Sequence, residues 1–274
     1  MPYFSSQTAQ YHYHVYGTGK QILLAFHGFG MRGTQFRVLE EALGQKYTIY
    51  SFDLFFHGET KLFDTSRKAV KKSINKKDFA QDMLSFLESI NQHNQKFSLL
   101  SYSIGSKLAL SLISEIPNQI EEAYFVAPDG IKPNLLLETG AKSKIVNQIF
   151  WKLVYSPKTV KYLLNKLFRF KYIDASLHYI LSKEFTSTET RLTCYNTITY
   201  FAELNLNKKL IINQINDAEI NTHFYFGSKD VLFPPKIGKD FTKNLKNSNL
   251  HIINDGHDLV NSHLNSLMKA TAND

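Results

Sequence analysis

A run of ten residues sets the strongest constraint on how this chain can fold. Residues 99–108 read Leu-Leu-Ser-Tyr-Ser-Ile-Gly-Ser-Lys-Leu, so an apolar strand passes through a turn of small residues directly into a helical pattern. Strand and helix can approach closely only where the residues two before and two after the central one are small. Ser101 and Gly105 hold those positions around Ser103. The run therefore predicts a strained turn that carries the Ser103 hydroxyl at the end of a strand.

Two later segments supply chemical partners for this hydroxyl. Asp230 follows the aromatic strand pattern that ends at Gly227, and His257 follows an apolar strand pattern and a glycine turn. A serine hydroxyl is a poor nucleophile until an imidazole takes its proton, and a carboxylate fixes the tautomer of that imidazole. The order serine, acid, histidine, each at the carboxyl end of a strand, favours a catalytic triad of Ser103, Asp230 and His257.

Two alternatives to this interpretation remain open. Ser103 could simply cap the N-terminus of the following helix, which is common for a serine between a strand and a helix. Asp129 follows the next strand along the chain and is the rival for the acid. The Gly-x-x-Asp context of Asp230 favours Asp230.

The chain resembles the α/β-hydrolase superfamily from about residue 10 to the last helix. Three segments carry the resemblance, and the first is the turn at Ser103. The second is a strand with a His-Gly turn at residues 22–30, Ile-Leu-Leu-Ala-Phe-His-Gly-Phe-Gly. The third is the strand and turn at residues 47–60, which resembles the family's Asp-x-x-Gly-His-Gly-x-Ser turn. The resemblance implies a serine hydrolase with a helical cap and an oxyanion hole formed by the backbone N–H groups of Phe29 and Ile104. Ser101 and Phe56 stand where the family has glycine.

Apolar strand patterns alternate with helical ones, which predicts an α/β fold with a mostly parallel central sheet flanked by helices. We expect a hydrolase core from residues 1–130 and 211–274, with a helical cap inserted at 131–210. Three flanking helices are expected, at 78–87, 235–245 and 259–268.

The expected cap carries 13 Lys and Arg against 5 Asp and Glu, an excess equal to the net charge of +8 of the whole chain. Residues 157–171 place Val160, Leu163, Leu164, Leu167 and Phe168 on one helical stripe, which suits a lid over an apolar pocket. We expect Phe150, Trp151, Tyr155 and Phe168 to line that pocket. The basic face indicates an anionic partner, which could be an acidic carrier or a lipid surface. The alternative is that its lysines only keep the helix soluble.

Several classes of site and location are disfavoured. His27 and His57 lie in turns and are expected to be scaffold residues, whereas His12 and His14 form a polar face of an edge hairpin strand. No metal-ligand spacing occurs, and no cofactor or nucleic-acid partner is expected.

Apolar runs are too short for a transmembrane segment and no signal-peptide pattern is present, so a cytoplasmic location is the default. Cys194 is the only cysteine.

The sequence thus favours a serine hydrolase that cleaves a small-molecule carboxylic ester or thioester through an acyl-enzyme. A C–C bond hydrolase with the same triad, and a non-catalytic binding module that retains the pocket, are the alternatives. Dehalogenase and epoxide-hydrolase activities are disfavoured, because those relatives have an aspartate where this chain has Ser103.

Overall fold

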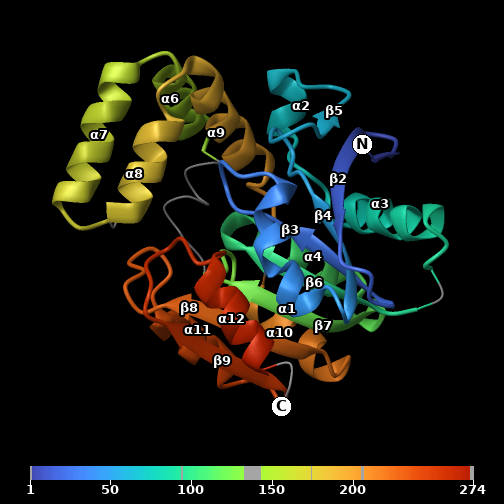
Figure 1. The fold of residues 1–274 in the computed structure, drawn as a ribbon. Helices are drawn as coiled ribbons and strands as arrows, with labels where there is room; N and C mark the ends of the chain where they lie inside the picture. The colour runs from blue at the N-terminus through green and yellow to red at the C-terminus, as the bar shows by residue number, and fades with distance from the viewer. Residues whose placement is uncertain (1, 94, 133–142, 174, 205–206, 272–274) are drawn as a thin grey trace.

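The computed structural model describes residues 2–93, 95–132, 143–173, 175–204 and 207–271, and Figure 1 shows their arrangement. A nine-stranded sheet forms the centre, in the order β1-β2-β4-β3-β6-β7-β8-β9, with β5 paired to β2. The strands are β1 (Tyr3–Ser5), β2 (Ala9–Tyr16), β3 (Gln21–Phe26), β4 (Tyr47–Phe52), β5 (Lys61–Leu62), β6 (Phe97–Tyr102), β7 (Ile120–Val126), β8 (Asn221–Gly227) and β9 (Ser248–Ile253).

The sheet is mostly parallel, as the sequence predicts. Strands β4, β3, β6, β7, β8 and β9 pair in parallel, and only β1, β2 and β5 add antiparallel pairings. Strand β6 is buried along its whole length, as expected for a central strand covered on both faces. The loops that follow the parallel strands therefore meet at one edge of the sheet.

Helices cover both faces of the sheet and bury two hydrophobic clusters. One cluster packs β-strand side chains against α3 (Lys76–Ser89), α4 (Ser106–Glu115), α10 (Lys208–Asp217) and α11 (Pro235–Thr242). The other packs the opposite face against α1 (Glu40–Leu43), the preceding 3₁₀ helix (Gly33–Leu39) and α12 (Ser262–Thr271). Two further short 3₁₀ helices cover Ser103–Gly105 and Pro117–Gln119.

Between β7 and α10, the described residues form a group of four helices, called the inserted helices below. They are α6 (Lys144–Val154), α7 (Pro157–Arg169), α8 (Ala175–Glu184) and α9 (Thr188–Tyr200). They pack mainly on one another and stand together at one end of the molecule (Figure 1). Of the range 131–210 expected for the cap, residues 133–142, 174 and 205–206 lie outside the described residues, and α10 begins at Lys208 and packs against α4 of the core.

Local predictions hold with small differences. Helices occur at the three predicted places, but α12 begins at Ser262 because the side chain of Asn261 accepts hydrogen bonds from the N–H groups of His263 and Leu264 and caps it. The strand that carries His12 and His14 is not an edge strand, since β2 lies between β1 and β4. The short helix α2 (Arg67–Lys71) lies between β5 and α3 in the chain.

Candidate active site

Ser103 sits at the turn between β6 and α4 in the strained conformation that its sequence predicts. Its φ is +50°, in the left-handed region that L side chains rarely adopt. A Cβ atom at Gly105 would lie 2.2 Å from the carbonyl oxygen of Phe26, so only glycine lets the start of α4 approach β3 this closely. At the other small position, Ser101 is buried with its Oγ 3.0 Å from Ser106 Oγ. This contact explains how serine replaces glycine there.

Ser103, His257 and Asp230 form a continuous chain of hydrogen bonds. His257 Nε2 lies 3.2 Å from Ser103 Oγ, and His257 Nδ1 lies 2.8 Å from Asp230 Oδ2. All three side chains are buried. Because the carboxylate can only accept, Nδ1 carries the proton and Nε2 is left to accept the hydroxyl proton of Ser103. Loops far apart in the sequence thus bring together the three residues named from the sequence.

Further contacts hold the acid and the histidine in place. The second oxygen of Asp230, Oδ1, accepts hydrogen bonds of 2.9 Å from the backbone N–H groups of Leu232 and Phe233. The Tyr102 hydroxyl donates to the carbonyl oxygen of His257 at 2.9 Å, and the rings of Tyr102 and Phe233 lie 5.4 and 5.5 Å from the His257 ring. The sequence reasoning missed Tyr102 and Phe233, although each lies within three residues of a motif residue.

Asp129, the rival acid, points elsewhere. Its backbone N–H donates to the Ser103 carbonyl at 3.1 Å, and its carboxylate lies 3.6 Å from the Lys107 ammonium group. The carboxylate in contact with His257 is that of Asp230.

The loop after β3 passes directly over Ser103. A Cβ atom at Gly28 would lie 2.5 Å from the Tyr102 ring and 3.6 Å from Ser103 Cβ, so glycine allows the close approach. Phe29 and Ile104 follow Gly28 and Ser103 in the chain, and both line the cavity beside Ser103. The two backbones expected to form the oxyanion hole therefore flank the same space.

Two histidines fix this loop, as expected for scaffold residues. His27 Nε2 accepts the N–H of Leu54 at 2.9 Å and its Nδ1 donates to the Gly28 carbonyl at 2.7 Å. His57 Nε2 accepts the N–H of Gly30 at 3.1 Å and its Nδ1 donates to the Phe55 carbonyl at 3.0 Å.

The environment keeps both of these histidines neutral. Burial lowers the pKa of His57. Burial, and then the neighbouring His57, lower the pKa of His27 to about 3. With both ring nitrogens engaged, neither imidazole is available as a general base.

A cavity of about 470 Å³ opens beside Ser103 and His257, and nearly all its lining is apolar. Four residues of the α7 stripe, Val160, Leu163, Leu164 and Leu167, line it. The rest of the lining is Phe29, Met31, Tyr102, Ile104, Asp129, Phe150, Leu153, Val154, Ile173, Leu181, Phe185, Arg191, Cys194, Ile198, Leu232 and Phe233.

Of the four residues predicted to line the pocket, Phe150 does so and the other three do not. Trp151 packs on Tyr155 and Tyr195, and the side chain of Tyr155 is exposed. Phe168 stacks on His178. Residues three and four apart share a helix face, so Leu153 and Val154 join Phe150 on the inner side. That spacing is the signal which could have identified them.

Arg191 and Cys194 are the buried polar groups of the cavity wall that contact no triad residue. Arg191 donates to the carbonyls of Val154, Phe185 and Thr186 and to the Thr188 hydroxyl, at 2.7 to 3.0 Å. It thereby ties the end of α6 to the segment after α8. Burial raises the pKa of Cys194 to about 12, so its thiol stays protonated.

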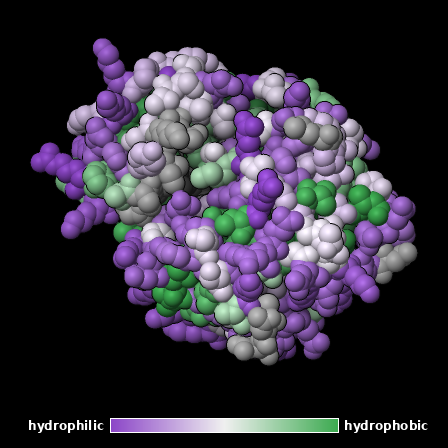
Figure 2. Space-filling view, in the orientation of Figure 1, coloured by the Kyte–Doolittle hydropathy of each residue, from purple (hydrophilic) through white to green (hydrophobic). Residues whose placement is uncertain are grey.

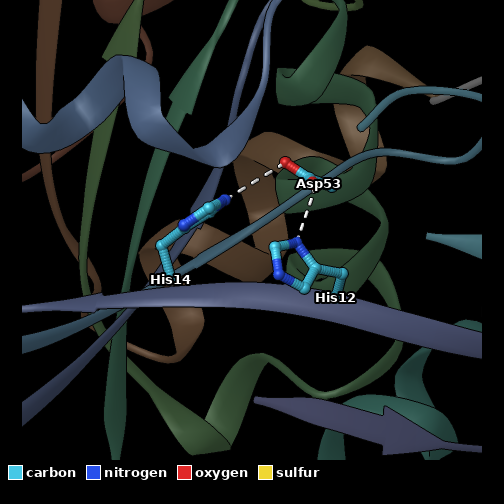
Figure 3. A group of neighbouring side chains, drawn as sticks. All are labelled: His12, His14 and Asp53. Carbon is cyan, nitrogen blue, oxygen red and sulfur yellow. Dashed lines mark hydrogen bonds and ion pairs between the residues drawn. The ribbon is translucent and has the colours of Figure 1, made fainter. Parts of the chain in front are cut away.

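Among the described residues, one cluster has side chains that could hold a metal ion: His12, His14 and Asp53. Both histidines project from β2 toward the carboxylate, as Figure 3 shows. His12 Nδ1 lies 2.8 Å from Asp53 Oδ2, which is a hydrogen bond and shorter than the roughly 3.3 Å between two ligands around a tetrahedral zinc ion.

The carboxylate of this cluster is already occupied. Asp53 accepts the N–H groups of Gly33 and Glu59 at 2.7 and 2.9 Å, and these bonds lower its pKa although burial opposes the shift. Burial lowers the pKa of His14, so that imidazole is neutral at pH 7. The hydrogen bonds of Asp53 to His12, Gly33 and Glu59 thus hold the turn after β4.

The comparisons with known proteins agree with this architecture. Residues 17–262 match the family described as serine aminopeptidase, S33, and the chain belongs to that family of α/β-hydrolases. It is therefore a hydrolase. A stretch of 108 residues is 29% identical to "Protein phosphatase methylesterase 1" of Kluyveromyces lactis, covering 36% of this chain and 27% of that protein.

Solved structures share the fold at low sequence identity. An esterase from Thermogutta terrifontis is 14% identical with a TM-score of 0.70, over 97% of this chain and 92% of that one. MGS-M2, an α/β hydrolase from a Medee basin deep-sea metagenome library, is 14% identical with a TM-score of 0.70, over 100% and 98% of the two chains. None of the helices in the described ranges combines the length and the apolar character needed to span a bilayer.

Acidification should destabilise the protein through the two neutral histidines. Their folded pKa values lie below the unfolded value of about 6.5, so the unfolded chain binds more protons below that pH and unfolding becomes easier. For His27 the loss between pH 7 and pH 5 is about 2 kcal/mol. We expect a smaller loss of unfolding free energy over this interval in His27→Gln and in His57→Gln, measured by urea denaturation. An unchanged pH dependence in both variants would contradict this assignment.

Proposed function

We propose that the protein is a serine hydrolase that cleaves carboxylic esters or thioesters through an acyl-enzyme. The observation that carries the proposal is the buried hydrogen-bond chain from Asp230 through His257 to Ser103. The adjoining apolar cavity suits an acyl group, and an esterase and a methylesterase are among the proteins similar to this chain.

In the acylation step, His257 Nε2 takes the proton of Ser103 while Oγ attacks the carbonyl carbon of the ester. Asp230 holds the Nδ1–H tautomer and stabilises the imidazolium that forms. Protonated His257 then gives its proton to the departing alcohol or thiol as the tetrahedral intermediate collapses. Ser103 is left esterified with the acyl group in the cavity.

Deacylation repeats these steps with water. His257 takes a proton from the water molecule as its oxygen attacks the acyl carbon, and then returns the proton to Ser103 as the acid leaves. We propose that the backbone N–H groups of Phe29 and Ile104 stabilise the oxyanion in both steps. Such donors often lower the barrier by several kcal/mol.

The name of the family raises peptide cleavage as a second candidate activity. An aminopeptidase must bind the cationic amino group of its substrate, for which a free carboxylate is the natural partner. Besides the triad, Asp129 is the only carboxylate in the described cavity lining, and its oxygen lies 3.6 Å from the Lys107 ammonium group. This pairing favours an uncharged acyl group over an amino terminus.

We further propose the inserted helices as a cap over the active site, and an anionic partner for their basic surface. Residues 131–210 hold the whole excess charge, and Phe150 and four residues of the α7 stripe line the cavity. A cytoplasmic location is consistent with the single buried thiol of Cys194, which leaves no internal disulfide to form.

Substitutions in the triad should separate the two candidate acids. We expect Ser103→Ala and Asp230→Asn to lower kcat for p-nitrophenyl butyrate by at least about 10⁴-fold, because each removes a member of the relay. Asp129→Asn should change kcat less than about tenfold. Including an aminoacyl p-nitroanilide and a vinylogous diketone in the same assay tests peptide and C–C bond cleavage. Full turnover by Ser103→Ala would refute the proposal.

The cavity wall should set the length of the acyl group. Leu164 is buried on α7 and lines the cavity, so Leu164→Phe should lower the ratio of kcat/KM for decanoate over butyrate esters by at least tenfold. Tyr155→Ser is the control, because Tyr155 is exposed and lies outside the lining. An equal change in both variants would show that α7 does not bound the acyl site.

A further inference from the structure

Helix α7 has two unlike faces. Its inner face lines the cavity with Val160, Leu163, Leu164 and Leu167. The basic outer face of α7, as we define it, consists of Lys158, Lys161, Tyr162, Lys166 and Arg169, which recur at helical spacing and are all exposed.

The charge on and around this face is of one sign. Residues 143–173, all of them described, contain seven Lys and Arg and no Asp or Glu. Lys166 lies over the Tyr162 ring at 5.9 Å. In the described part of the chain, the four cations of the outer face form no ion pair with a carboxylate. A partner for this face must therefore bring negative charge.

Aromatic side chains accompany these cations. Tyr162, Phe170 and Tyr172 are 63%, 59% and 68% exposed, although each carries a large aromatic ring. Helix α7 lies at the outer edge of the molecule (Figure 1), and hydrophilic side chains project from that edge (Figure 2). A lipid surface offers both partners that this combination needs: anionic headgroups for the cations and an apolar layer for the rings.

We propose that the basic outer face of α7 docks on the surface of an anionic lipid bilayer. A second part of the proposal, which rests on the proposed function, is that acyl esters enter the cavity from that surface. Leu163 and Leu167 line the cavity and are 39% and 41% exposed, so accessible apolar surface of α7 borders the space beside Ser103.

The strength of such docking can be estimated from its charges. Each Lys or Arg near an anionic membrane contributes about fivefold to the partition coefficient, and the effect falls with added salt. Replacing Lys158, Lys161, Lys166 and Arg169 by Gln should therefore weaken binding by at least tenfold.

The test measures co-sedimentation of the full chain with vesicles of phosphatidylcholine, alone or mixed with phosphatidylglycerol. We expect the wild type to bind only the mixed vesicles and the fourfold Gln variant to lose at least tenfold in partitioning. The matched control replaces Lys68, Lys71, Lys72 and Lys77 by Gln, which removes the same charge from exposed positions outside the inserted helices. This control should stay within about twofold of the wild type.

Three outcomes would overturn the docking proposal. They are a wild type that does not bind the mixed vesicles, an equal loss in both fourfold variants, and binding to an acidic acyl carrier protein instead of to vesicles. A second assay separates docking from the proposed function by comparing two substrates. The α7 variant should hydrolyse soluble p-nitrophenyl butyrate at a rate within twofold of the wild type. It should hydrolyse a long-chain ester held in mixed vesicles at least tenfold more slowly than the wild type. Vesicle binding without hydrolysis of either ester would leave docking intact and refute the hydrolase proposal.

Discussion

The close approach of β3 to the start of α4 is the contact on which the site depends. Only a glycine at position 105 leaves room for the Phe26 carbonyl oxygen, and this packing holds Ser103 at its positive φ. The backbone strain at Ser103 is supported by two buried strands, β6, which leads into it, and β3 beside β6. The hydroxyl of Ser103 is thereby fixed at the edge of the sheet where the loops after β8 and β9 bring Asp230 and His257.

Of the three histidines around the site, His257 is the one whose Nε2 faces the Ser103 hydroxyl. His27 and His57 use both ring nitrogens to hold the loop that carries Phe29, and burial keeps them neutral. The cavity in front of Ser103 is almost wholly apolar, and charge–charge and hydrogen-bond interactions are stronger in such surroundings than in water. A proton passed from Ser103 to His257 would therefore be stabilised chiefly by the carboxylate of Asp230.

The parts of the structure that sequence predicts are those set by short local patterns. Ser103, Asp230 and His257 each follow a strand pattern, and a parallel sheet brings the ends of its strands to one edge, so their proximity could be predicted. The cavity lining could not, because it depends on how the inserted helices are rotated against one another. Phe150 faces the cavity while Trp151, one residue on, does not. Leu181 comes from α8, a helix with no clear apolar stripe, and Phe185 from the turn that follows it. The contact of His12 and His14 with Asp53 likewise joins segments about forty residues apart.

The most direct test of the central claim is covalent labelling. Wild-type protein and Ser103→Ala are incubated with a fluorophosphonate probe, and the adduct is located by mass spectrometry of peptides. We expect one adduct per wild-type molecule, on Ser103, and none on the folded Ser103→Ala protein. Labelling at another residue, or no labelling of well-folded wild type, would contradict the assignment of Ser103 as an activated nucleophile.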